Sequence, residues 1–323
     1  MTVQRTLAML ALGLGACAGA GTAAAAYPEK PITLVVTYPP GGTVDAVARM
    51  LGPRLSAELG QSVIIENKGG AGGMIGGAYV ARAAADGYTL MLDASNHAQN
   101  PAVQANMAFD TLGAFTPVSL LLRVPNVLVT TPASAVQSVN DVIEGGRRSG
   151  NALMFASSGP GSAQHLAGEL FNHLAKTHLE HVPYKGGGPA MVDVMAGQVP
   201  IMFASMGSAW THVQSGKLRA IAVTGKSRSS AAPDLPTLAE SGVPGYEAYE
   251  WNAVFAPAGT PPEIVDTVSA ALAKVVRSPE MRKQLEAIGA DPVGSTPAEL
   301  DTFRRAEIEK WKTLVQEAGL KTN

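Results

Sequence analysis

The sequence contains very little cysteine, charge or aromatic side chain. Its single cysteine is Cys17, so the chain beyond it offers no disulfide, thiolate nucleophile or cysteine metal site. Only 15% of the residues are charged and the formal net charge is −2, whereas a nucleic-acid surface needs clustered lysine and arginine. No run after the N-terminal region reaches the roughly 20 apolar residues of a membrane-spanning helix. We therefore expect a folded domain without nucleic-acid partners.

Residues 1–26 are predicted to be a signal peptide. Arg5 precedes a short apolar core, and Ala24-Ala25-Ala26 provides an A-x-A cleavage pattern just before Tyr27. The quartet Leu14-Gly15-Ala16-Cys17 also matches a bacterial lipoprotein signal, in which Cys17 would carry a lipid. Both alternatives export the chain, so we expect a periplasmic protein, either free or anchored through Cys17.

After the leader, short apolar runs alternate with alanine-rich amphipathic segments. This alternation predicts an α/β fold with largely parallel sheets. Strands are expected at 32–37, 63–66, 90–93, 127–130, 153–156, 181–184, 201–203 and 218–224, and helices at 46–59, 75–84, 163–175, 189–196, 262–277, 280–288 and 297–318.

The closing helices have no strands of their own to cover, so we expect them to pack on the first strand–helix series. This predicts two doubly wound α/β domains with a ligand cleft between them. Domain 1 would be discontinuous, with residues 27–127 plus 251–323, and domain 2 would comprise 128–250. The two chain crossings, near 125–130 and 245–255, would act as a hinge.

A glycine-rich loop follows the first apolar strand. It runs from Tyr38 through Pro39, Pro40, Gly41 and Gly42, and Thr43 and Asp45 open the next helix. No lysine or arginine lies between residues 30 and 49, so an anion here would be held by main-chain N–H groups and the positive helix end. Asp45 has two interpretations, an acid that favours the helix dipole or a ligand contact.

Three further loops of this kind occur, at residues 67–73, 156–165 and 182–189. Ser162 is predicted to be the N-cap of the helix after the second, and Lys185 adds one charge to the third. Each loop alone is compatible with an ordinary turn. The four together, divided between two lobes, predict a cleft lined by amide donors from both sides.

Signatures of other chemistry are incomplete. The segment Ser158-Gly159-Pro160-Gly161 is not the G-x-S-x-G elbow of hydrolases. The three histidines between 173 and 181 lack the H-E-x-x-H spacing, and the loop Gly69–Gly73 does not match G-x-G-x-x-G. We therefore predict no catalytic residue, no metal ligand and no cofactor.

Many separated blocks of the sequence resemble the extracytoplasmic substrate-binding proteins of tripartite tricarboxylate transporters, the Bug family. The resemblance covers essentially the whole chain after residue 26. Its blocks include residues 27–32, 38–45, 66–67, 70–73, 86–90, 97–101, 159–162, 165–169, 182–186, 215–220 and 256–261.

The resemblance implies a periplasmic binding protein of type II-like architecture that closes around a small carboxylate like a Venus flytrap. One carboxylate would be held by main-chain groups and ordered water in the loop Pro40–Thr43. The second lobe would complete the site. The predicted ligand-binding residues are Tyr38, Pro40, Gly41, Gly42, Thr43, Asp45, Gly72, Ser95, Ser158, Gly159, Ser162, His165, Tyr184, Lys185 and Ser205.

Two positions depart from the family pattern. Family members often carry an acid where this chain has Ala204, and its loss favours a plain carboxylate over an amino acid. Asp93 stands where a small or hydroxylic residue is usual, and we expect it to bring an acid toward the cleft.

The predicted function is therefore that of a monomeric, non-enzymatic solute-binding protein that delivers a small carboxylate to a tripartite tricarboxylate-type membrane transporter. One alternative is a ligand sensor that presents its closed form to a membrane signalling protein. The other is an enzyme that acts on a phosphate or nucleotide.

Overall fold

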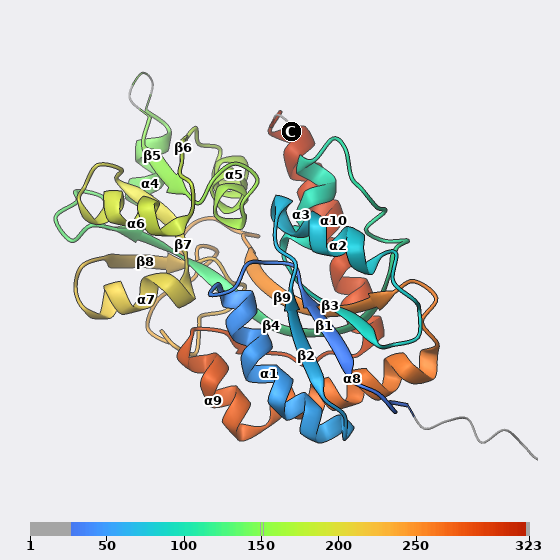
Figure 1. Ribbon diagram of the computed structural model, residues 1–323. Coiled ribbons are helices and arrows are strands. Elements are labelled where there is room, and N and C mark those ends of the chain that lie inside the picture. Colours follow the sequence, from blue (N-terminus) through green and yellow to red (C-terminus); the bar gives the residue numbers. More distant parts are fainter. Residues whose placement is uncertain (1–26, 149, 151, 321–323) are drawn as a thin grey trace, which may run out of the picture.

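The computed structural model describes residues 27–148, 150 and 152–320, and it shows helices packed on both faces of a mixed sheet (Figure 1). The strands are β1 (Ile32–Val36), β2 (Val63–Asn67), β3 (Thr89–Ala94), β4 (Phe115–Thr130), β5 (Met154–Ser157), β6 (Glu180–Pro183), β7 (Ile201–Ser205), β8 (Arg219–Val223), β9 (Tyr249–Pro257) and β10 (Asp291–Pro292). The helices are α1 (Thr43–Leu59), α2 (Met74–Val80), α3 (Asn96–Val103), α4 (Val139–Gly146), α5 (Ala163–Ala175), α6 (Gly187–Met195), α7 (Met206–Gln214), α8 (Pro262–Arg277), α9 (Pro279–Ala287) and α10 (Pro297–Glu317), and Ala71–Gly73 form the short 3-10 helix η1.

The strand order is β2-β1-β3-β9-β4-β7-β5-β6, and β8 and β10 also pair with β4. Parallel pairs lie toward both ends of this order, in β1–β2, β1–β3, β5–β6 and β5–β7. The central strands are antiparallel, because β4 carries the chain into the second half of the sheet and β9 brings it back. The expected α/β fold is confirmed, but the expectation of largely parallel sheets is wrong at the centre.

β4 is a single strand that belongs to two sheet segments. Up to Pro125 it pairs with β9, and from Asn126 it pairs with β7 and β8. We name the strands joined to its first part the first sheet segment (β1, β2, β3, β9 and β10). Those joined to its second part are the second sheet segment (β5 to β8). The sequence predicted only the last four residues of β4.

Several helices begin and end where the sequence predicts. α5 begins after Ser162, whose side chain accepts a hydrogen bond from the His165 amide, and α8 has Pro262 in its first turn. Both helices have the predicted bounds because these residues define a helix start locally. The short helices α3, α4 and α7 were not predicted.

The closing helices pack on the N-terminal elements. α8 lies against α1, and α10 lies against α3 and β4 (Figure 1). Lys274 Nζ of α8 is 2.7 Å from Glu58 Oε1 of α1. The domain limits, 27–127 with 251–323 and 128–250, stay a prediction.

The side chains of alternate strand residues pack into two apolar cores, one on each face of the sheet. Leu34 and Leu92 belong to the core that α1 and α8 cover, and Val35 and Met91 to the core beneath α3 and α10. This alternation is the period of two that β-strands impose on side-chain direction. No helix in the described residues is long and apolar enough to cross a membrane. The predicted leader and Cys17 lie outside those residues.

Candidate functional site

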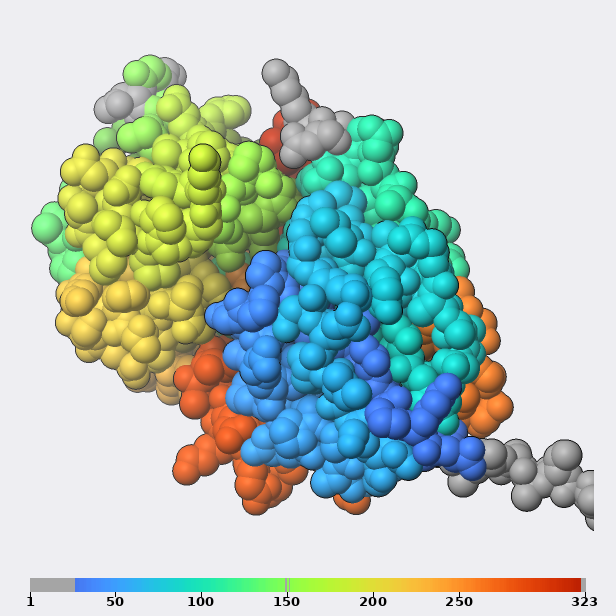
Figure 2. Space-filling model, in the orientation of Figure 1, coloured from blue at the N-terminus to red at the C-terminus, as the bar shows by residue number. Residues whose placement is uncertain are grey.

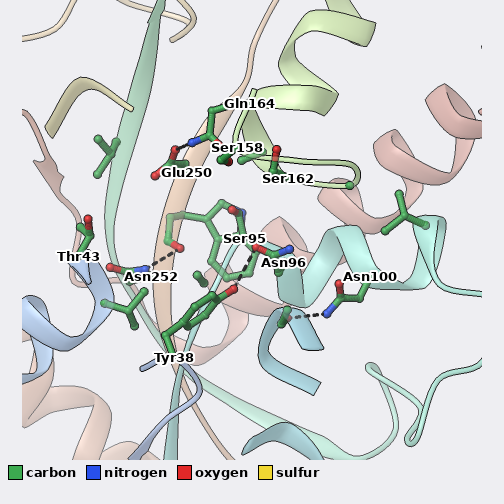
Figure 3. A pocket seen from close by; sticks show the side chains of 18 of the residues that line it. Tyr38, Thr43, Ser95, Asn96, Asn100, Ser158, Ser162, Gln164, Glu250 and Asn252 are labelled. Atoms are coloured by element: carbon green, nitrogen blue, oxygen red, sulfur yellow. Dashed lines mark hydrogen bonds between the residues drawn. The ribbon is translucent and has the colours of Figure 1, made fainter. Parts of the chain in front are cut away.

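A cavity of about 480 Å³ lies where the two sheet segments meet, and loops from both contribute to its wall (Figure 3). In the space-filling view, the blue and cyan N-terminal segments meet the green and yellow segments along this junction (Figure 2). The lining residues are Tyr38, Thr43, Val44, Ala71, Gly72, Ala94, Ser95, Asn96, Asn100, Val103, Gln104, Leu122, Val124, Ser158, Pro160, Gly161, Ser162, Ala163, Gln164, Glu250, Trp251 and Asn252.

The cavity brings together part of the predicted ligand-binding set. The predicted residues that line it are Tyr38, Thr43, Gly72, Ser95, Ser158 and Ser162. The predicted residues outside its wall are Pro40, Gly41, Gly42, Asp45, Gly159, His165, Tyr184, Lys185 and Ser205. A ligand role for any of these residues stays a prediction, and the contacts below show what each group already does within the chain.

Asp45 holds the first loop, Tyr38–Thr43, through hydrogen bonds. Its buried carboxylate accepts hydrogen bonds from the Gly41 amide, Arg49 Nε and Asn67 Nδ2, each at 2.9 Å. The hydrogen bond from Arg49, with those from Gly41 and Asn67, lowers the pKa of this carboxyl to about 2. The Gly41 amide therefore serves the protein's own acid, which corrects the expectation that it is free for an anion.

The N-terminus of α1 nevertheless faces the cavity. Gly42 is its N-cap and supplies no side-chain cap, so the first amides of the helix lack intrahelical acceptors. Thr43 and Val44, in that first turn, line the cavity. Unpaired amides and the positive helix end together favour an anion at this position.

The N-terminus of α5 reaches the cavity from the second sheet segment. Ser162 Oγ accepts from the His165 amide at 3.2 Å and donates to the Gly159 carbonyl at 2.7 Å. His165 Nδ1 accepts from the Gly161 amide at 3.1 Å. The side chains of Ser162 and His165 thus hold the loop in shape.

The His165 ring stacks on His181 with 3.9 Å between ring centroids. Burial, and then the neighbouring His165, lower the pKa of His181 to about 4. The hydroxyl of Ser157 lies 2.6 Å from His181 Nε2. A neutral His181 therefore supports the loop that opens α5.

We expect acid to weaken this support. A histidine whose pKa is lower in the folded than in the unfolded state resists protonation only when folded. The free energy of unfolding should therefore fall as the pH drops from about 6.5 to about 4. His181→Gln should flatten this decline in urea titrations at several pH values. The exposed His178→Gln is the control and should not flatten it; equal declines in all three proteins would contradict the assignment.

The third predicted loop lies outside the cavity wall. Tyr184 donates its hydroxyl proton to Asp193 Oδ2 at 2.6 Å, and Lys185 is exposed. Ser205 Oγ donates to Glu250 Oε2 at 3.2 Å. Ser205 thus contacts the cavity indirectly, through a residue that does line it.

Several lining residues were missed by the sequence analysis, above all Glu250 and Asn252 on β9. Glu250 accepts hydrogen bonds from Gln164 and Ser205. Asn252 is buried, and its Oδ1 has no hydrogen-bond partner in the described part of the chain. No glycine-rich motif marks β9, so only its pairing between β3 and β4 places these side chains at the cavity.

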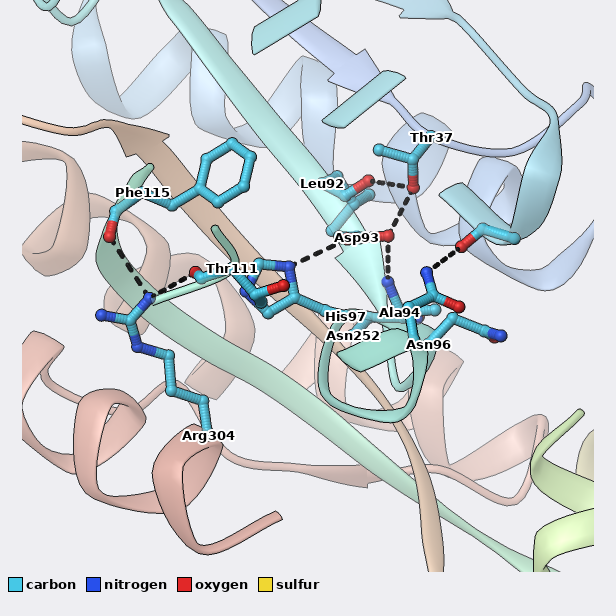
Figure 4. Close-up of polar contacts among 12 residues, drawn as sticks. Thr37, Leu92, Asp93, Ala94, Asn96, His97, Thr111, Phe115, Asn252 and Arg304 are labelled. Carbon is cyan, nitrogen blue, oxygen red and sulfur yellow. Dashed lines mark hydrogen bonds and ion pairs between the residues drawn. The ribbon is translucent and has the colours of Figure 1, made fainter. Parts of the chain in front are cut away.

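Asp93 does not bring an acid to the cleft, and that expectation is wrong. Its Oδ1 accepts from Thr37 Oγ1 at 2.6 Å and from the Ala94 amide at 2.9 Å, and its Oδ2 lies 3.1 Å from His97 Nδ1 (Figure 4). The contacts with Thr37 and His97 are buried, and the His97 ring stacks on Phe255 with 4.1 Å between ring centroids. Thr37 contacts the acid rather than the imidazole, which is not the order of a nucleophilic triad.

Ala204 is fully buried and pairs with Val127 across β4 and β7. The missing acid at this position does not leave the site without one, because Glu250 comes from β9 and contacts the next residue, Ser205. The expected preference for a plain carboxylate over an amino acid, which rested on Ala204, therefore loses its basis.

Residues 47–320 match the family model described as "Tripartite tricarboxylate transporter family receptor". The chain belongs to this family. It is 37% identical to protein BugT of Bordetella pertussis, over 99% of both chains. It is 35% identical to a protein encoded between tcbD and tcbE in Pseudomonas sp. strain P51, over 99% of this chain and 96% of that one.

Solved structures of the family share the fold. R. palustris Rpa4515 with adipate superposes with a TM-score of 0.80 at 37% identity, and the periplasmic binding protein BugD with 0.78 at 32%; each match covers 92% of this chain and all of the other. MatC from Rhodopseudomonas palustris with bound malate gives 0.75 at 31%, over 90% of this chain and all of the other. The predicted family and the periplasmic-binding-protein fold are thus confirmed. None of these findings supports a lipid on Cys17.

Proposed function

We propose that this protein captures a small carboxylate in the periplasm and delivers it to a tripartite tricarboxylate-type transporter. The cavity carries the proposal, because the first turns of two helices, α1 and α5, meet in its wall. Among the described residues that line it there is no lysine, arginine or histidine. Main-chain amides and neutral donors are therefore the groups that would hold an anion. Adipate and malate in the sites of two family members support the ligand class.

We further propose that binding closes the two predicted domains. The ligand would bridge α1 and η1 on one side and α5 on the other, and the chain would flex where β4 and β9 cross between the halves. Tyr38, Ser95 and Ser158 supply side-chain hydroxyls along this path. Burial raises the pKa of Tyr38 well above its usual value, so its phenol stays protonated and donates to Asn96 Oδ1.

A thermal-shift screen of the purified protein tests this function. Adipate, malate, citrate and benzoate are the probes, with inorganic phosphate as the comparison anion. A ligand at 100 times its Kd should stabilise the folded state by about 2.7 kcal/mol. At least one carboxylate should raise the Tm and phosphate should not; no response to any carboxylate would contradict the proposal.

Gly42→Val tests the position of the anion. A Cβ at Gly42 would meet nothing nearer than the Pro39 carbonyl oxygen at 3.9 Å, so the fold should tolerate valine. Its methyl groups would nevertheless block the approach to the α1 amides. Carboxylate affinity, measured by calorimetry, should fall strongly, whereas the unliganded Tm should fall only slightly, because valine is a poorer N-cap than glycine. Gly188→Val, at an exposed glycine with open space around its Cβ, is the matched control.

A further inference from the structure

Glu250 is a carboxyl group held inside the cavity by neutral partners only. It lies on β9, opposite Val124 of β4, and forms part of the cavity wall. Gln164 Nε2 donates to its Oε1 and Ser205 Oγ to its Oε2. Gln164 is itself fixed by Ser158, whose hydroxyl donates to Gln164 Oε1 at 2.5 Å. Glu250 is thus positioned by α5 through Gln164 (Figure 3) and by β7 through Ser205.

Within the described residues 27–148, 150 and 152–320, no cation balances this carboxyl from the elements packed around it. On β4, the Arg123 guanidinium lies over the Tyr249 ring, 4.9 Å from its centroid. Arg123 pairs with Trp251, the residue after Glu250 on β9. Neighbouring residues of a strand point to opposite faces, so Arg123 lies on the face away from Glu250. On α5, His165 is bonded to the Gly161 amide. From the β1–α1 loop, the titratable group is the phenol of Tyr38, whose hydroxyl donates to Asn96 Oδ1.

This environment favours the neutral acid. Burial raises the pKa of Glu250 to about 7, although the hydrogen bonds from Ser205 and Gln164 act in the opposite direction. A second carboxylate that enters the cavity would disfavour the ionised form further, since like charges at close range cannot both stay ionised at little cost. A protonated carboxyl, by contrast, donates a strong hydrogen bond to a carboxylate.

We propose that Glu250 binds the ligand's second carboxylate as a protonated acid, so that capture of a dicarboxylate takes up one proton from solvent. The inference rests on the proposed function and specifies the ligand class of the same cavity. The first carboxylate binds at the amides of α1. The second lies by Gln164 and shares the proton of Glu250. The site then selects dianions without a cationic side chain in its wall.

Calorimetry with adipate and malate from about pH 6 to about pH 8.5 tests the proposal, because both ligand carboxyls are ionised across most of this range. The wild-type protein should lose affinity as the pH rises, by up to about tenfold per pH unit above the Glu250 pKa. Titrations in buffers of different ionisation enthalpy should show proton uptake that is small at about pH 6 and approaches one proton per ligand above the Glu250 pKa. Glu250→Gln, whose amide also donates, should bind with an affinity that no longer depends on pH. The exposed Glu263→Gln should behave like the wild type.

Each outcome has one meaning. Binding of a dicarboxylate at about pH 8.5 without proton uptake, or with the same pH dependence in Glu250→Gln, would overturn the role of Glu250 and leave the proposed function standing. Proton release, with affinity that rises with pH, would show that Glu250 is ionised in the complex and would likewise overturn the proposal. If neither the wild type nor Glu250→Gln binds any carboxylate at any pH, the proposed function itself fails.

Discussion

Asp45→Ala is expected to lower carboxylate affinity by about tenfold or more, the order of effect when one charge-assisted hydrogen bond is lost. The acid lies outside the cavity wall, and it fixes the Gly41 amide, Arg49 and Asn67 in one arrangement. Without it, the loop before α1 loses its anchor and the first amides of the helix lose their fixed direction. Calorimetry measures the affinity, and urea unfolding measures the accompanying loss of stability.

Asp141→Ala is the matched control for this variant. Asp141 is also a first-turn acid, and its Oδ2 accepts from the amides of Gln137 and Ser138 at 2.9 Å, but it caps α4 away from the cavity. It should reduce stability without changing affinity. If a folded Asp45→Ala binds as tightly as the wild type, the loop does not need this anchor.

Trp251→Ala should produce the largest loss of stability, about 3–5 kcal/mol in the free energy of unfolding. Trp251 is fully buried on β9, and its ring meets Phe303 of α10 edge-on at 5.6 Å between centroids. Its loss leaves a void between the sheet and α10, at a residue that also lines the cavity. Urea unfolding followed by circular dichroism gives the value.

Trp251→Phe retains an aromatic ring and should cost clearly less than the alanine variant. A loss below about 1 kcal/mol for Trp251→Ala would mean that the surrounding chain collapses into the void. The core would then be more plastic than its packing indicates.

The sequence predicted those features that neighbouring residues determine. Ser162 caps α5, and Pro262 begins α8, so both helices have the expected bounds. The loops at Tyr38–Thr43 and Ser158–Ser162 were found because glycine, proline and a following helix lie together in the chain. Their meeting at one cavity followed from the predicted cleft.

The features that escaped prediction depend on distant partners. The first part of β4 contains Pro117 and Pro125, which argue against a strand. The structure accommodates Pro117 next to a register shift and Pro125 where β4 leaves β9. Glu250 lacks any local motif and gains its place from Gln164, 86 residues earlier. The Asp93 side chain is oriented by its contacts with Thr37 and His97, and it does not point into the cavity.

The continuity of β4 makes the two halves of the molecule mutually dependent. An isolated segment 128–250 would keep only the last three residues of β4. It would lose two of the five residue pairs that join β4 to β7 and one of the four that join it to β8. The complementary fragment, residues 27–127 with 251–323, would lose β7 and β8. The end of its β4 would then be an unpaired edge. Unfolding of either half removes a neighbour from the other, which favours a single cooperative transition over two separate ones. Evolutionary exchange of one half between relatives is therefore constrained to crossover points that leave Phe115–Thr130 intact.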